Sequence, residues 1–123
     1  MQLEQKRTLV TKYSIVHGRL NFAKIAEYAV LEVEKEFAEK VKVGEPMKLQ
    51  RAAKIATDMV MYFPTQMVVR SFPKRIRLMY SKNFLPKHDA SRKNVARFVR
   101  QIFNPVVRNA RMRLMIEGKI SAK

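Results

Sequence analysis

The chain has 123 residues, no cysteine and a formal net charge of +16 at pH 7, from 26 Lys and Arg against 10 Asp and Glu. This length predicts one domain with a modest core, and the lack of cysteine excludes disulfides and thiolate metal sites. So large a positive charge favours a polyanionic partner, namely nucleic acid, anionic lipid or an acidic protein.

The positive charge is concentrated in the second part of the chain. Residues 1–50 hold nine basic and seven acidic residues, a net of +2, whereas residues 51–123 hold seventeen and three, a net of +14. We therefore expect two regions: amphipathic and apolar helices over residues 1–70, and a basic helical extension over residues 71–123.

The first twenty residues are basic and poor in acids, in which they are similar to a mitochondrial presequence. Leu9, Tyr13, Val16 and Leu20 are spaced by four, three and four residues, which predicts a helix with one apolar face.

A second amphipathic helix is predicted from Asn21, a residue that commonly caps helices. Apolar residues recur every three or four positions from Phe22 to Val41, which corresponds to about six turns. Gly44 suits a left-handed cap at the end of this helix, and Pro46 cannot continue it.

The densest apolar stretch is Ile55 to Val69, which is bounded by Lys54 and Arg70. As a helix it would be about 22 Å long, shorter than the roughly 30 Å hydrocarbon core of a bilayer. It lies either in a protein core or in a membrane, and Pro64 should kink or end it.

Two features of this region are candidate contact sites. Ala52, Ala53 and Ala56 form a small-residue face on which another helix can pack closely. Asp58 is either exposed on the polar side of the helix or, in a membrane, a functional polar contact.

The remaining elements are basic helices. We expect a short helix over residues 74–80, a helix capped by Ser91, and a boundary at Asn104-Pro105 before a last helix. Arginine grips phosphate with its planar fork. The candidate lipid- or phosphate-binding residues are Arg70, Lys74, Arg75, Arg77, Arg97, Arg100, Arg108 and Arg111.

The predicted fold is therefore all-α, with amphipathic helices, one kinked apolar helix and the basic C-terminal extension. With only three glycines the chain carries no Rossmann or P-loop fingerprint, and no catalytic constellation stands out. His17 and His88 lack the spacing of metal ligands. We expect no enzyme activity, no metal and no cofactor.

Two segments together resemble subunit g of the mitochondrial ATP synthase membrane region. The first contains Arg19-Leu20, Phe22, Tyr28-Ala29 and Val33-Glu34, similar to the family's matrix-side amphipathic helix. The second is Ala56 to Phe63, similar to an Ala-Thr-acid run before aliphatics and an aromatic pair. The resemblance covers residues 9–70. The family's small-xxx-small glycines are replaced here by Thr65, Gln66, Val68 and Arg70, and Pro64 intervenes.

This resemblance implies a non-catalytic structural subunit in the mitochondrial inner membrane, which supports ATP synthase dimer assembly and membrane curvature. The implied partners are other membrane subunits, such as one like subunit e, and anionic lipid such as cardiolipin. Asp58 would then be the polar intramembrane contact.

Two alternatives remain open at this point. An RNA-binding structural protein, such as a mitochondrial ribosome subunit, would account equally well for the basic helices. A basic helical adaptor for an acidic partner is the third possibility.

Overall fold

The computed structural model describes residues 15–16, 19–38, 43–84 and 92–121, and within them the chain is almost entirely helical. The helices are α2 (Phe22–Glu36), α3 (Glu45–Val60), α4 (Thr65–Arg70), α5 (Lys74–Phe84) and α6 (Arg92–Ile116). The all-α class predicted from the sequence is confirmed for the described residues.

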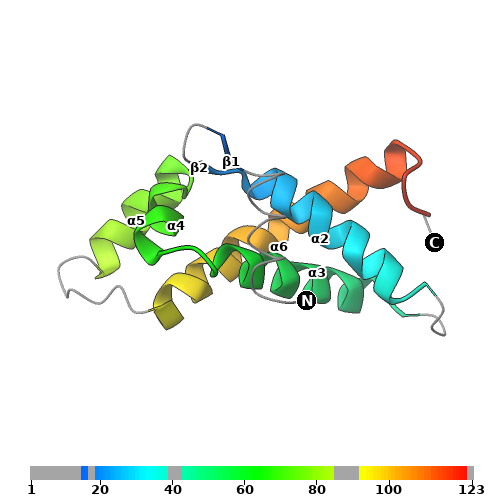
Figure 1. Ribbon diagram of the computed structural model, residues 1–123, viewed down its shortest axis with the longest axis horizontal. Helices are drawn as coiled ribbons and strands as arrows, with labels where there is room; N and C mark the ends of the chain where they lie inside the picture. The colour runs from blue at the N-terminus through cyan, green and yellow to red at the C-terminus, as the bar shows by residue number, and fades with distance from the viewer. Residues whose placement is uncertain (1–14, 17–18, 39–42, 85–91, 122–123) are drawn as a thin grey trace.

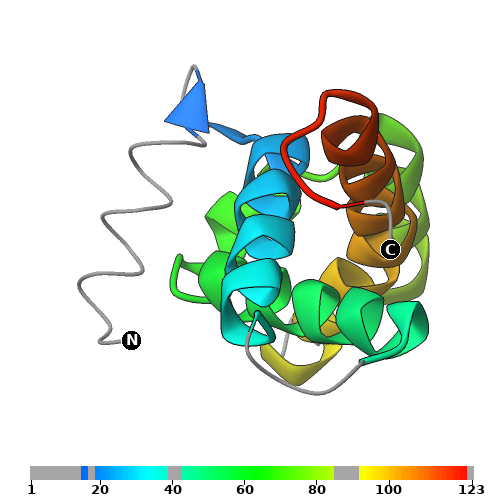
Figure 2. The ribbon, with the colours of Figure 1, turned by 90° about the vertical axis from the view of Figure 1, so that its right-hand side faces the viewer.

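Helix α6 runs along the length of the molecule, and α2 and α3 both pack on it and on each other (Figure 1). Viewed along this long axis, α2, α3 and α6 lie around one shared interior (Figure 2). The shorter α4 and α5 gather at the opposite end from the C-terminus, where α4 contacts both β2 and α6.

A short β-pair precedes α2. Strands β1 (Ile15–Val16) and β2 (Arg19–Leu20) are antiparallel, with Ile15 opposite Leu20 and Val16 opposite Arg19. The helix predicted through Leu9 and Leu20 is therefore wrong at residues 15–16 and 19–20, because Leu20 reaches the core from an extended chain. Residues 1–14 and 17–18 lie outside the described residues.

Helix α2 begins as the sequence predicts. Asn21 is the N-cap, and its Oδ1 accepts a hydrogen bond from the Lys24 N–H at 3.2 Å. The apolar face is buried at Ile25, Ala29 and Val33. The helix ends at Glu36, so it is shorter than the six turns predicted; Val41 lies outside the described residues.

Gly44 and Pro46 begin a helix and do not end one. Gly44 is the N-cap of α3 with φ −64° and ψ 151°, an extended conformation, so the predicted left-handed cap is wrong. Pro46 lies in the first turn of α3, where its missing N–H leaves no helical hydrogen bond unmade.

The Ile55–Val69 stretch is the end of α3, a turn and α4, so the predicted single kinked helix is wrong and the alternative, that the helix ends in this segment, is what the fold shows. Helix α3 ends at Val60, Pro64 is the N-cap of α4, and the break lets the two helices fold back on the core. Met59, Val60, Phe63 and Val68 are buried in the protein's own interior. Within the described part of the chain, no helix combines the length and the apolar character that crossing a membrane requires.

The boundary predicted at Asn104-Pro105 is also wrong, because α6 is continuous from Arg92 to Ile116 with Pro105 inside it. An internal proline removes one helical hydrogen bond and costs roughly 3 kcal/mol. Phe103 and Val107, on either side of Pro105, are both buried in the core, so packing on one face offsets that cost. Ser91, the predicted cap, lies outside the described residues.

The core spans both of the regions that the sequence divides at residue 70. Phe22 of α2 lies edge-on against Phe103 of α6, with ring centroids 5.2 Å apart. Phe72, which precedes α5, packs edge-on against Tyr80 and lies 6.3 Å from Phe22. Residues from before and after position 70 therefore belong to one hydrophobic cluster.

Candidate nucleic-acid interface

Three arginines of α6 bond to α3 or to Met61, the residue that caps its C-terminal end. Arg92 Nη2 donates to the Met61 carbonyl, Arg100 Nη2 donates to the Gln50 carbonyl at 3.2 Å, and Arg111 Nε donates to Glu45 Oε1 at 3.2 Å. As the α6 residue number rises, the α3 partner number falls, so the two helices are antiparallel. The role of these three arginines is therefore to connect helices within the fold.

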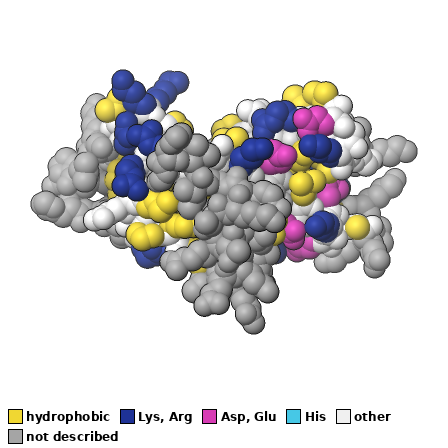
Figure 3. Space-filling model, turned by 45° about the horizontal axis from the view of Figure 1, so that its top comes forward, with side chains coloured by type: hydrophobic (Ala, Val, Ile, Leu, Met, Phe, Trp, Pro, Cys, Tyr) yellow, Lys and Arg dark blue, Asp and Glu magenta, His cyan; other side chains and the backbone are white. Residues whose placement is uncertain are grey.

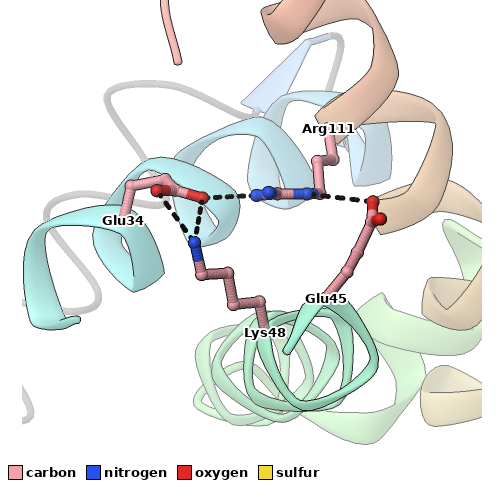
Figure 4. Close-up of polar contacts among 4 residues, drawn as sticks. All are labelled: Glu34, Glu45, Lys48 and Arg111. Carbon is pink, nitrogen blue, oxygen red and sulfur yellow. Dashed lines mark hydrogen bonds and ion pairs between the residues drawn. The ribbon is translucent and has the colours of Figure 1, made fainter. Parts of the chain in front are cut away.

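Arg111, which is buried, lies at the centre of an ion network whose carboxylates keep contact with water (Figure 4). Its side chain is only 4% exposed, and its guanidinium contacts both Glu34 of α2 and Glu45 of α3. Lys48 Nζ lies 3.4 Å from the same Glu34 oxygen. Two carboxylates and two cations therefore balance within the junction of α2, α3 and α6.

This network corrects the prediction for Arg111. A guanidinium that is 4% exposed and whose N–H groups are directed at Glu34 and Glu45 has little surface left for a phosphate. We therefore remove Arg111 from the expected lipid or phosphate ligands. Arg100 is half-buried and holds the Gln50 carbonyl, so only part of its fork faces solvent.

The outer side of α6 carries exposed basic residues. Lys93, Arg97 and Arg108 are all exposed, and at helical spacing they fall on one side of α6. Arg97 and Arg108 are about 16 Å apart along the helix axis. No acidic residue occurs in α6, so no carboxylate of its own opposes these cations.

Helices α4 and α5 carry the second group of predicted residues. Arg70, Lys74 and Arg75 are exposed and Arg77 is half-buried. Neither helix contains an acidic residue. Figure 3 shows Lys and Arg side chains without acidic ones at this end of the visible face, whereas the end over α2 mixes both signs.

Asp58 and the three alanines lie on opposite sides of α3. Asp58 is exposed and lines a pocket of about 400 Å³ between α2 and α3, together with Glu32 and Arg51. Ala52, Ala53 and Ala56 are buried in the core. The fold thus separates the acid from the small-residue face.

Arg19 is a basic residue that the sequence gives no reason to select. Strand β2 holds it beside Lys74 and Arg77 of α5, in one pocket with them. A long-range hydrogen bond joins β2 to the segment before α5: the Leu20 N–H donates to Ser71 Oγ at 3.0 Å across 51 positions of sequence. Local periodicity carries no information about such a contact.

Within the described residues, the ion pairs gather mainly on α2 and α3, whereas α5 and the outer side of α6 carry basic residues and no acidic ones. The described ion pairs involve carboxylates of α2, of α3 and of the segment after α6. The exposed cations of α5 and of the outer side of α6 have no ion pair with a described residue. Comparison with family models, with curated proteins and with solved structures found no match to the chain.

Proposed function

We propose that the protein is a non-catalytic RNA-binding structural protein. The observation that carries this proposal is the separation of charge. Glu34, Glu36 and Glu45 are held in ion pairs with basic residues. The exposed basic residues of α5 and α6 lie on helices that contain no acid. A polyanion would therefore meet cations without having to displace carboxylates.

Phosphate binding accounts for these residues through two physical effects. Each neutralised phosphate releases condensed counterions, which makes association favourable at low salt. Arginine adds bidentate, charge-assisted hydrogen bonds to phosphate oxygens. Arg97 and Arg108 on the outer side of α6 are the residues that we expect to make such contacts.

The packing of the Ile55–Val69 stretch also supports this function. Met59, Val60, Phe63 and Val68 already bury their side chains inside the protein, so this stretch offers little apolar surface to lipid. The excess of positive charge is then the feature that the function must explain, and the negatively charged backbone of RNA is complementary to it.

A structural subunit of the mitochondrial ATP synthase membrane region is the second candidate, and one observation favours it. Leu78 and Met79 of α5 are 61% and 49% exposed, beside the cations Lys74 and Arg75. Exposed apolar and basic residues on one helix suit an anionic membrane surface, for which cardiolipin is the expected lipid. In that function Asp58 and a subunit e-like partner would keep the roles that the resemblance implies.

A salt titration with matched variants tests the first candidate. The affinity of the purified protein for a structured RNA is measured from 50 to 300 mM salt, and we expect a linear fall of log K with log salt. Changing both Arg97→Gln and Arg108→Gln should reduce the steepness by about 1.4 to 1.8, the loss expected for two phosphate contacts. Lys24→Gln with Lys35→Gln, on exposed positions of α2, removes the same charge and should leave the slope unchanged.

Vesicle flotation separates the two candidates. A protein that floats with cardiolipin-containing vesicles at 150 mM salt, and that shows no salt-dependent RNA binding, would overturn the RNA proposal in favour of the second. Equal losses of slope in the α6 and α2 double variants would show that the binding comes from net charge alone, and would overturn the assignment to α6.

A further inference from the structure

A pocket of about 440 Å³ opens at the end of the molecule where β2, the start of α2 and the start of α5 meet. Arg19, Lys74 and Arg77 line it, and no lining residue is acidic. The remaining lining residues are Leu20, Asn21, Phe22, Ser71, Phe72 and Pro73.

The base of this pocket is fixed by contacts that are already within the core. Ser71 Oγ accepts from the Leu20 N–H at 3.0 Å and donates to the Met67 carbonyl at 2.8 Å, which ties β2 to α4. Phe22 and Phe72 are buried, with ring centroids 6.3 Å apart. These contacts hold β2, which carries Arg19, beside the segment that leads into α5, which carries Lys74 and Arg77.

Three cations held around one pocket repel each other unless an anion neutralises them. No acidic residue occurs between Asp58 and Asp89, so the chain places no carboxylate within α4 or α5 to do so. A hollow lined by one sign of charge concentrates the potential and attracts counter-ions. The first turn of α5 adds to this potential. The Arg77 N–H donates to the Pro73 carbonyl at 2.9 Å, but proline has no side-chain acceptor for the other N–H groups of this turn, and these groups carry partial positive charge.

We propose that this pocket, formed by Arg19, Lys74 and Arg77, binds a phosphate monoester in its dianionic form. Two arginine forks and one lysine ammonium match tetrahedral phosphate oxygens. Three positive charges favour a dianion over the single charge of a phosphodiester. The site is separate from the outer side of α6 and does not depend on the proposed RNA-binding function.

The test uses the full-length protein and inorganic phosphate at pH 8, followed by ¹H–¹⁵N NMR at constant ionic strength. We expect saturable shifts of the Leu20, Phe22 and Lys74 amides, and binding at least about tenfold tighter than that of dimethyl phosphate, which carries one charge. Arg19→Gln and Arg77→Gln should each weaken phosphate binding by about tenfold, because each removes a hydrogen bond between charged groups. Arg113→Gln, on an exposed arginine of α6 outside the pocket, should leave it unchanged.

Three results would overturn the site: shifts that do not saturate, equal affinities for phosphate and dimethyl phosphate, or an equal loss in Arg113→Gln. Lys74→Gln serves as a further variant, since Lys74 is exposed and its loss leaves the core intact. Competition then distinguishes the sources. If an RNA with a 5′-phosphate competes better than its 5′-hydroxyl form, the site is assigned to an RNA end. If glycerol phosphate competes as well as that RNA, the site is assigned to a free monoester.

Discussion

The seven basic residues of α6 differ in what they contact, although the sequence presents them as one run. Arg92, Arg100 and Arg111 donate to groups of α3 or of the turn after it. Lys93, Arg97 and Arg108 face solvent. The difference follows from which side of α6 packs on α3, and it decides which substitutions should affect stability and which should affect binding.

Replacing Arg111 tests its role in stability. Arg111→Met keeps the apolar stem but leaves Glu34 and Glu45 without the guanidinium, and we expect a loss of about 2 kcal/mol in the free energy of unfolding. That is below the usual cost of breaking a buried pair, because both carboxylates keep some contact with water and Lys48 still lies beside Glu34. Urea unfolding followed by circular dichroism measures the change.

The neighbouring Arg113 provides the control, because it is exposed and has no ion pair with a described residue. Arg113→Met should change the unfolding free energy by less than about 0.5 kcal/mol. Similar losses in the two variants would contradict a structural role that is specific to Arg111.

The N-cap of α2 gives a second prediction at this scale. Asn21→Ala removes the acceptor of the Lys24 N–H and should cost about 1 kcal/mol of stability. Asn109→Ala, on an exposed position inside α6, should cost nothing or stabilise slightly, because alanine favours helix. Thermal melting of both variants compares them, and a cost as large for Asn109→Ala would refute the capping assignment.

At the level of elements, the sequence predicts what is decided locally. The start and apolar face of α2 follow from Asn21 and from apolar spacing, and both are present in the fold. The predictions for Gly44 and Pro105 are wrong because the structure around each residue determines whether a helix begins, continues or ends there. Gly44 precedes a new helix, and Pro105 is retained inside α6 because Phe103 and Val107 pack on the same core.

Pro105 should be a destabilising residue within α6. Pro105→Ala restores the N–H that can bond to the Gln101 carbonyl, and we expect a gain of about 1 to 2 kcal/mol, less than the full cost of a helix-interior proline because the unfolded chain also becomes freer. Pro73→Ala is the matched control, since Pro73 precedes the first turn of α5, and should change stability by less than about 0.5 kcal/mol. Denaturant unfolding measures both, and a net loss in Pro105→Ala would contradict this account.

The candidate sites show the same limit of sequence reasoning. Composition alone places the excess of positive charge after residue 50. Composition does not show that Arg97 is exposed whereas Arg111 is paired within the fold, nor that Arg19 lies beside Lys74. Both facts depend on contacts between distant parts of the chain. The role predicted for Asp58 in a membrane complex remains a prediction.

At the scale of the whole molecule, the shared core predicts that the two sequence regions unfold together. Phe103→Ala removes a fully buried ring that packs on Phe22, and should cost about 3 to 5 kcal/mol. Hydrogen exchange should then show the same loss of protection in α2, α3 and α6. Amides of α2 and α3 that kept their wild-type protection would instead support separate units divided at residue 70.

The junction at Arg111 also has a consequence for synthesis on the ribosome. Arg111 meets Glu34 across 77 positions and Glu45 across 66, so α2 and α3 leave the exit tunnel well before the helix that covers them. A nascent chain therefore displays an apolar surface on α2 and α3 until α6 has been synthesised and has left the tunnel. The core should therefore form only after α6 emerges, and more slowly than the high helix content alone would suggest, because its contacts join distant parts of the sequence.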